Sequence, residues 1–388
     1  MSSRFRKLVG AGAAAALIVG LAACSTSGEG GGNAGGDSSG EPVRFGVALP
    51  DTGNSAQYGE YFRQGFDLAL EEINAAGGVQ GRQVELVFED TQADPAQAPQ
   101  VAQKFVDDQS ILAVIGDFGT PATAAASQIY QDAGLVQFAF SASGSAVTEP
   151  GDYVFATWVS QEHEAPRLAE FAAETGKKAA VFYHDTDWGQ ETYGFYQNGE
   201  QSSGIEEVYS TAYDPASTDF RPLLLAAKNA NPDVIVLISY AADGALITAQ
   251  AREIGIETPI VGISSIYNQQ FIELAGDAAE GVQTLSYFTP ENDDPKVQQF
   301  IADFEAATGQ PTPSDYAIRA YDALHAVAQG AERAGELTRQ GLRDALDNGE
   351  PFDSILYGEF TLDADTRRVS DAEQFPLVIE NGAFTIQK

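Results

Sequence analysis

The feature that most constrains the fold is a regular alternation of short apolar runs with helical patterns. Runs such as Val43–Leu49, Ile111–Ile115 and Val234–Ile238 are almost wholly apolar, which is typical of strands buried on both faces of a parallel sheet. Between such runs apolar residues recur at three- and four-residue steps, as in Glu60–Ala76. There are too many strands for one open sheet, so the sequence predicts an α/β fold of two doubly wound parallel-sheet lobes.

The alternation continues to Gly262 and then stops. Successive helices are expected at Lys296–Thr308, Tyr316–Ala334 and Arg339–Asp347, followed by short strands near Tyr357–Leu362 and Phe375–Ile379. A chain that leaves one lobe, builds a second and returns to the first would produce this order of elements. The remaining strands are expected at Val84–Phe88, Val136–Phe140, Ala179–Tyr183, Glu207–Tyr213 and Pro259–Gly262, and the remaining helices at Pro95–Val106, Ala122–Ala133, Glu164–Thr175, Gln190–Ser203, Phe220–Ala230 and Gly244–Ile254.

The N-terminus has the pattern of an export signal. Three basic residues are followed by the uncharged run Leu8–Ala23, which is shorter than the roughly 20 residues of a membrane-spanning helix. We expect residues 1–23 to be a signal peptide. Leu21-Ala22-Ala23-Cys24 has the form of a bacterial lipobox, which predicts lipidation of Cys24 and anchoring on the extracytoplasmic face of the cell membrane. Residues 24–42, rich in Gly and Ser, are the expected anchor and flexible linker.

Composition and motifs exclude several classes of function. The chain has 21 basic and 56 acidic residues and a net charge of −35, so its surface repels nucleic acid. The acids are scattered, which is typical of a soluble surface. Its three histidines have no metal-ligand spacing, and there is no phosphate loop, dinucleotide fingerprint or nucleophile elbow. We therefore expect no enzyme, no metal and no cofactor, although a hydrolase with an unusual site stays open.

Several stretches resemble the substrate-binding proteins of branched-chain amino acid ABC transporters, the leucine/isoleucine/valine-binding type of class I periplasmic binding protein. The resemblance covers the chain from Val43 to Ile386. The stretches that carry it are Gln57–Gly59, Glu72–Gly81, Glu89-Asp90, Asp94-Pro95, Ala113–Gly116, Thr148–Gly151, Ser217–Phe220, Gln250–Arg252 and Ala275–Gly281.

The resemblance implies two lobes joined by three crossovers, near Ala156–Gln161, Ser286–Thr289 and Ile355–Gly358. Residues 43–156 and 289–355 would form the first lobe, and residues 157–288 and 356–388 the second. It also implies a monomer that closes around a small polar solute and delivers it to the permease subunits of an ABC importer. A sensor subunit that reports to a membrane partner is the alternative function.

Two loops follow strands at the edge where open parallel sheets bind ligands. Gly116–Pro121 leads into a helix, with Thr120 suited to cap it and Pro121 suited to its first turn. Ser141–Ser145 follows the next strand. Hydroxyl groups beside the free amides of a helix N-terminus are suited to a carboxylate.

The resemblance further implies ligand contacts at Tyr58, Thr120, Ala142, Ser143, Trp188 and Tyr240. Thr120 and Ser143 would donate hydrogen bonds to the ligand carboxylate, and the aromatic residues would form walls. Trp188 stands where the family pattern has a tyrosine. The aromatic residues expected around the site are Tyr58, Phe118, Trp158, Trp188, Tyr240 and Tyr267.

One position departs from the family pattern. Ser264 stands where amino-acid-binding members have an acidic residue that pairs with the ligand ammonium. A buried ammonium without an anion or several acceptors is costly. Either another group serves, with Asp117 and Asp243 the nearest in sequence, or the ligand is an amide, a urea or a carboxylic acid rather than an α-amino acid.

Overall fold

The computed structural model describes residues 40–369 and 372–388. The predicted signal peptide, Cys24 and nearly all of the predicted linker lie outside these residues. Within the described ranges, no helix is both long enough and apolar enough to cross a membrane.

The first sheet has five parallel strands in the order β2-β1-β3-β4-β5. They are β1 (Val43–Leu49), β2 (Val84–Asp90), β3 (Ile111–Ile115), β4 (Val136–Ala139) and β5 (Val154–Ala156). The order reverses between β1 and β3, which makes the space beyond their carboxyl ends a switch point.

The second sheet repeats this order. Its parallel strands run β7-β6-β8-β9-β10, and β13 and β14 extend it on the β10 side as antiparallel strands. The two sheets confirm the predicted fold of two doubly wound lobes. The strands are β6 (Lys178–His184), β7 (Glu206–Tyr213), β8 (Val234–Ile238), β9 (Ile260–Gly262), β10 (Gln283–Ser286), β13 (Phe375–Glu380) and β14 (Ala383–Ile386).

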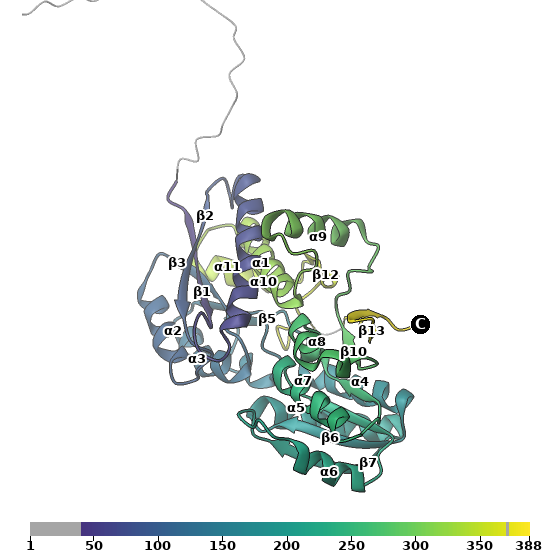
Figure 1. Cartoon of the computed structure of the whole chain (residues 1–388). Helices are drawn as coiled ribbons and strands as arrows, with labels where there is room; N and C mark the ends of the chain where they lie inside the picture. The colour runs from purple at the N-terminus through teal and green to yellow at the C-terminus, as the bar shows by residue number, and fades with distance from the viewer. Residues whose placement is uncertain (1–39, 370–371) are drawn as a thin grey trace, which may run out of the picture. The chain divides into compact units, whose positions relative to one another are not determined.

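Helices cover both faces of the first sheet (Figure 1). Phe45 and Val47 of β1 pack toward α1 (Ala56–Ala75) and α10 (Asp315–Arg333), whereas Ala48 packs toward α2 (Ala98–Asp107) and α3 (Thr120–Asp132). The alternation of side chains along a strand explains why its whole run is apolar. Helices α9 (Pro295–Thr308) and α11 (Arg339–Leu346) add to the core on the α1 and α10 side.

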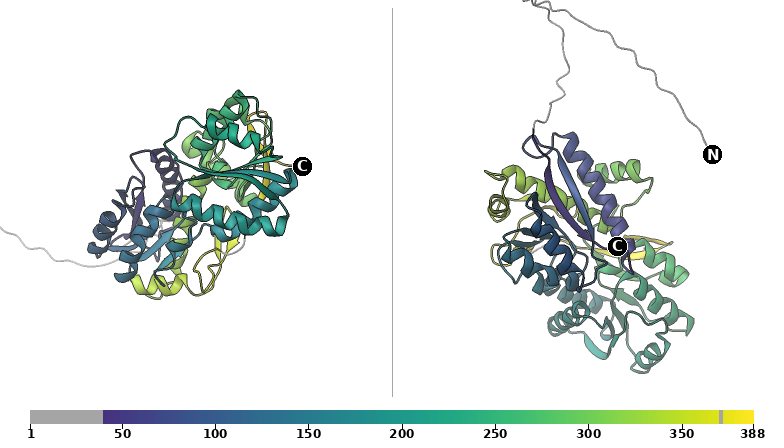
Figure 2. Two further views of the ribbon diagram at one scale, coloured as in Figure 1. Left: turned by 90° about the horizontal axis from the view of Figure 1, so that it is seen from below. Right: turned by 90° about the vertical axis from the view of Figure 1, so that its left-hand side faces the viewer.

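The second sheet is covered in the same way (Figure 2). On one face lie α4 (Gln161–Thr175) and α5 (Asp187–Ser203). On the other lie α6 (Arg221–Asn229), α7 (Ala241–Glu253) and α8 (Gln269–Ala275). Each lobe therefore has its own apolar layers on both sides of a sheet.

The chain passes from the first sheet to the second between β5 and α4, and it returns to the first lobe after β10. The third crossover does not lie where the sequence places it. The hairpin β11 (Phe352–Ser354) and β12 (Gly358–Phe360) stays with the first lobe, because the Asp322 carboxylate of α10 accepts hydrogen bonds from the Ser354 hydroxyl and the amides of Ile355 and Leu356. The expectation of a crossover near Ile355–Gly358, with residues 356–388 in the second lobe, is therefore wrong.

The chain instead follows the edge of the first sheet as far as Val369. Arg368 forms a parallel bridge with Ala156 of β5. Its side chain is only 3% exposed and donates to the carbonyl oxygens of Ala142, Gly144 and Trp158 and to the Thr148 hydroxyl. The third crossover thus lies between Val369 and the start of β13.

Candidate functional site

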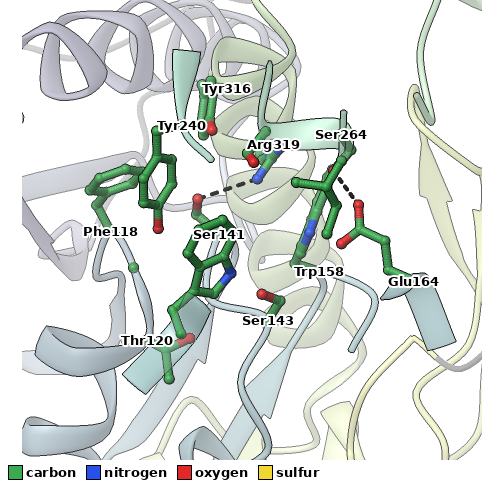
Figure 3. A pocket seen from close by; sticks show the side chains of 14 residues that line it. Phe118, Thr120, Ser141, Ser143, Trp158, Glu164, Tyr240, Ser264, Tyr316 and Arg319 are labelled. Atoms are coloured by element: carbon green, nitrogen blue, oxygen red, sulfur yellow. Dashed lines mark hydrogen bonds between the residues drawn. The ribbon is translucent and has the colours of Figure 1, made fainter. Parts of the chain in front are cut away.

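A small cavity lies where loops from the carboxyl ends of both sheets converge, together with α10 and the first crossover (Figure 3). The side chains that line it leave little open space between them. Its lining residues are Phe118, Gly119, Thr120, Ser141, Ser143, Trp158, Glu164, Trp188, Tyr240, Ile263, Ser264, Ser265, Tyr316 and Arg319.

The first sheet contributes hydroxyl groups and a helix N-terminus. Gly119 precedes α3 with φ of 74°, a left-handed conformation that glycine adopts at little cost. The Thr120 hydroxyl accepts a hydrogen bond from the Gly144 amide at 3.0 Å, which leaves its own proton free to donate. Within the described ranges no group hydrogen-bonds the Ser143 hydroxyl, although Ser143 is only 5% exposed. This side of the cavity is therefore suited to an anionic group.

Aromatic rings form the walls. Trp188, in the first turn of α5, stacks on Tyr240 at the start of α7, with 4.6 Å between ring centroids. Phe118 stacks on Tyr58 at 4.4 Å. Both Trp188 and Tyr240 follow strands at the switch point of the second sheet, β6 and β8, so the topology places them opposite the Thr120 loop.

Arg319 of α10 is a buried cation at the cavity. Its side chain and that of Asp315 are 4% and 3% exposed, and the two form an ion pair at 2.5 Å. The guanidinium carbon lies 3.2 Å from the ring centroid of Trp158 and 4.3 Å from that of Tyr316. The ion pair and the two rings hold the guanidinium in one place.

Glu164 is a buried acid at the same cavity. It lies in the first turn of α4, is 4% exposed, and accepts a hydrogen bond from the Ser264 hydroxyl on one carboxylate oxygen. Burial raises the pKa of this carboxyl to about 7, while the Ser264 hydrogen bond and the charge of Arg319 act in the opposite direction. The site therefore contains both a fixed cation and an acid that ionises close to neutral pH.

The structure brings together most, but not all, of the residues named from the sequence. Phe118, Thr120, Ser143, Trp188, Tyr240 and Ser264 line the cavity, as does Trp158. Tyr58 does not line it and instead stacks behind Phe118, whose ring it supports.

Ala142 and Asp117 also lie away from the cavity. The Ala142 methyl group is buried in an apolar cluster with Ala139 and Val147. Asp117 is 1% exposed, and its carboxylate accepts the Phe118 amide at 2.5 Å. Asp243, the other acid considered from the sequence, is hydrogen-bonded by the Tyr213 hydroxyl and does not line the cavity. None of these three side chains is placed to contact a molecule in the cavity.

Sequence reasoning missed Glu164 and Arg319. Glu164 shares a helix face with the buried residues Leu168 and Ala172, one and two turns further on. Arg319 lies within the buried face of α10. A charged residue at a core position of an amphipathic helix was the available signal, since such residues are rarely buried without a partner.

Several buried carboxyls give the ligand-free protein an expected pH dependence. Burial raises the pKa of Glu164 and Glu200 to about 7 and that of Asp117, Asp243 and Asp322 to about 6. Since these values lie above those of the unfolded chain, the native state binds more protons between about pH 4 and 7. We expect the melting temperature to rise as the pH is lowered from about 8 to about 5. A melting temperature that falls steadily over this range would contradict the assignment of these groups.

The chain matches the family of periplasmic binding proteins over residues 42–375. Among curated proteins, it is 30% identical to the leucine-, isoleucine-, valine-, threonine- and alanine-binding protein of Pseudomonas aeruginosa over 309 residues. That alignment covers 79% of this chain and 82% of the relative.

Solved structures agree with this match. The branched-chain amino acid transporter substrate-binding protein of Streptococcus pneumoniae, in complex with isoleucine, has a TM-score of 0.81 at 27% identity and covers 88% of this chain and 97% of its own. An ABC transporter substrate-binding protein of Desulfitobacterium hafniense, in complex with Leu, has a TM-score of 0.76 at 27% identity. The match covers 90% of this chain and 100% of that protein's chain.

Proposed function

Because the chain belongs to the periplasmic binding protein family, whose matched relatives are solute-binding proteins of ABC transporters and not enzymes, we propose that it is the lipid-anchored solute receptor of an ABC importer. Its solute would be a small polar molecule: an amino acid, or a related amide, urea or carboxylic acid. Its partners would be the permease subunits of the importer. The lipobox at Cys24 and the Gly- and Ser-rich linker support an anchor on the extracytoplasmic face.

The observation that carries this proposal is that both lobes contribute to one cavity. Thr120 and Ser143 come from loops of the first sheet, whereas Trp188, Tyr240 and Ser264 come from the second. A solute that contacts both groups binds the closed arrangement of the lobes better than an open one, so it shifts the population toward closure. Closure is the event that a permease can recognise.

The lining suggests how the solute lies. The hydroxyls of Thr120 and Ser143 and the N-terminus of α3 are suited to the carboxylate. The rings of Phe118, Trp188 and Tyr240 are suited to an aliphatic or aromatic side chain. The relative from P. aeruginosa is named for binding leucine, isoleucine, valine, threonine and alanine, which makes small aliphatic amino acids the first solutes to test.

A panel of amino acids, their amides and the matching carboxylic acids tests this proposal. We expect at least one member to raise the melting temperature strongly. The double variant Thr120→Ala/Ser143→Ala should bind that solute at least tenfold more weakly by calorimetry, a loss of about 1.4 kcal/mol, because two donors to its carboxylate are removed.

The matched control is Ser202→Ala/Thr218→Ala, which removes two exposed hydroxyls of the second lobe and should bind the solute as the wild type does. Equal affinity of the wild type and the cavity double variant would place the carboxylate elsewhere.

A further inference from the structure

We propose that Glu164 binds the ammonium group of an α-amino acid solute, and that it replaces the acidic residue expected at Ser264. This inference rests on the proposed function and narrows its solute class from small polar molecules to α-amino acids. The juxtaposition of Glu164, Ser264 and the Arg319–Asp315 pair around one cavity carries it.

The position of Glu164 fits this role. Its carboxyl lines the cavity from α4, beside Ser264, and Figure 3 shows it on the other side of the cavity from Thr120. Figure 3 shows the Ser264 hydrogen bond ending on one of its two carboxylate oxygens. The Ser264 hydroxyl thus orients the carboxylate, and the second oxygen stays available as an acceptor.

The charges around the cavity point to a cationic ligand group. Arg319 is compensated by Asp315 at 2.5 Å, so that pair is neutral as a whole. Among the residues that the structure describes, no salt bridge compensates Glu164. A buried carboxylate without a cation is costly, and an ammonium group would remove that cost.

Placing the acid at residue 164 also explains why residue 264 is not acidic. The two side chains are in hydrogen-bond contact, so carboxylates at both positions would repel each other at close range. A carboxylate at one of the two positions and a hydroxyl at the other can form this hydrogen bond, whichever position carries the carboxylate. The total charge of the site is the same in both cases.

The alternative is that Arg319 binds the solute carboxylate and that no ammonium is needed. In that case a carboxylic acid that lacks the amino group would bind as well as the amino acid. Asp315 pairs with one amino group of the Arg319 guanidinium and the Ser141 hydroxyl accepts from the other at 3.4 Å, whereas Nε has no partner among the described residues. The comparison of amino acids with matching acids therefore decides between the two roles.

The test compares L-leucine, L-isoleucine and L-alanine with 4-methylpentanoate, 3-methylpentanoate and propanoate, which lack the amino group, by calorimetry on the full-length protein. We expect the best-bound amino acid to bind at least 100-fold more tightly than its matching acid. Glu164→Gln should weaken the amino acid at least 30-fold and change the affinity of the acid by less than threefold. The exchange variant Glu164→Ser/Ser264→Glu should recover part of the lost affinity, which a merely structural role of Glu164 would not produce.

A measurement on the wild type covers the case that the variants fail to fold. Binding an ammonium requires Glu164 to be ionised, so amino acid binding near pH 7 should release a proton, measured from the heat of binding in buffers with different ionisation enthalpies. The charged or titratable groups around Glu164 are Arg319 and Asp315 of α10, Tyr287 and Tyr357. If Glu164→Gln folds, amino acid binding to this variant should release no proton. This result would identify Glu164, and not Asp315, as the carboxyl that loses the proton.

Equal affinities for amino acids and matching acids, or a Glu164→Gln variant that binds amino acids as the wild type does, would overturn the role of Glu164 and leave the proposed receptor function intact. Failure of the wild type to bind any member of the full panel of amino acids, amides and carboxylic acids would overturn both.

Discussion

Replacing Arg319 by methionine is expected to lower the free energy of unfolding by about 3–5 kcal/mol, because it leaves the Asp315 carboxylate buried without its cation. The loss would be measured by denaturant unfolding. Burial raises the pKa of Asp315 even with Arg319 present, so the carboxyl of the variant should take up a proton on folding. The same variant should lose solute binding, since the guanidinium also holds the rings of Trp158 and Tyr316 at the cavity.

Two controls separate burial from charge. Lys296→Met removes an ion pair with Asp353 whose side chains are 61% and 70% exposed, and it should cost less than about 1 kcal/mol. Asp315→Leu/Arg319→Met replaces both buried charges and should recover most of the stability without recovering binding. If Arg319→Met cost no more than Lys296→Met, the pair would not be buried as described.

Gly65→Ala is expected to lower the free energy of unfolding of the first lobe by about 2 kcal/mol, the upper end of the usual overpacking cost less the gain in helix preference. A Cβ atom at Gly65 of α1 would lie 1.9 Å from the Ala317 carbonyl oxygen of α10, a backbone atom that can move away only if the two helices separate. Overpacking of this kind typically costs 1–3 kcal/mol, occasionally more, and it outweighs the roughly 1 kcal/mol by which alanine favours a helix over glycine. Thermal and denaturant unfolding would measure the effect.

Gly194→Ala in α5 is the matched control. Gly194 is an exposed helical glycine, and a Cβ atom there would meet nothing within 4 Å. Only the helix preference then changes, so the variant should gain up to about 1 kcal/mol. Two substitutions of the same chemical kind are thus expected to have opposite signs. A stabilised Gly65→Ala variant would contradict the close approach of α1 and α10.

The fold was predictable because burial on both faces of a sheet makes the sequence of each strand continuously apolar. A strand covered on both faces, such as β3 or β8, must be apolar throughout, and this pattern is legible without knowledge of its neighbours. The strands β5 and β10 were missed, because each is at most four residues long and adjoins a crossover.

The first residues of several helices were also predicted incorrectly from the sequence. The helices expected from Glu164, Gln190 and Gly244 begin at Gln161, Asp187 and Ala241. Their first turns carry polar and aromatic residues that serve the cavity or cap the helix, so the apolar period is hidden there. This is why Glu164 resembled an ordinary acid at a helix N-terminus.

The site was predictable to the extent that topology determines it. Thr120, Ser143, Trp188 and Tyr240 all lie just beyond the carboxyl ends of parallel strands, where a general rule places ligands. Arg319 was not accessible in this way, because α10 follows the second lobe in sequence and returns to the first in space. Its proximity to Trp158 depends on a contact between segments far apart in the chain.

The buried Arg368 guanidinium limits where the molecule can bend. It joins the third connecting segment to the backbone on either side of Ser143 and to Trp158 on the first connecting segment. Breaking the hydrogen bonds between the Arg368 guanidinium and these carbonyl oxygens would leave a buried cation without partners. We therefore expect the segments that carry them to move as one rigid body. For the proposed receptor, we therefore expect the chain to bend beyond Trp158 and Val369 on opening, so that the second lobe moves away from a half-site that stays assembled.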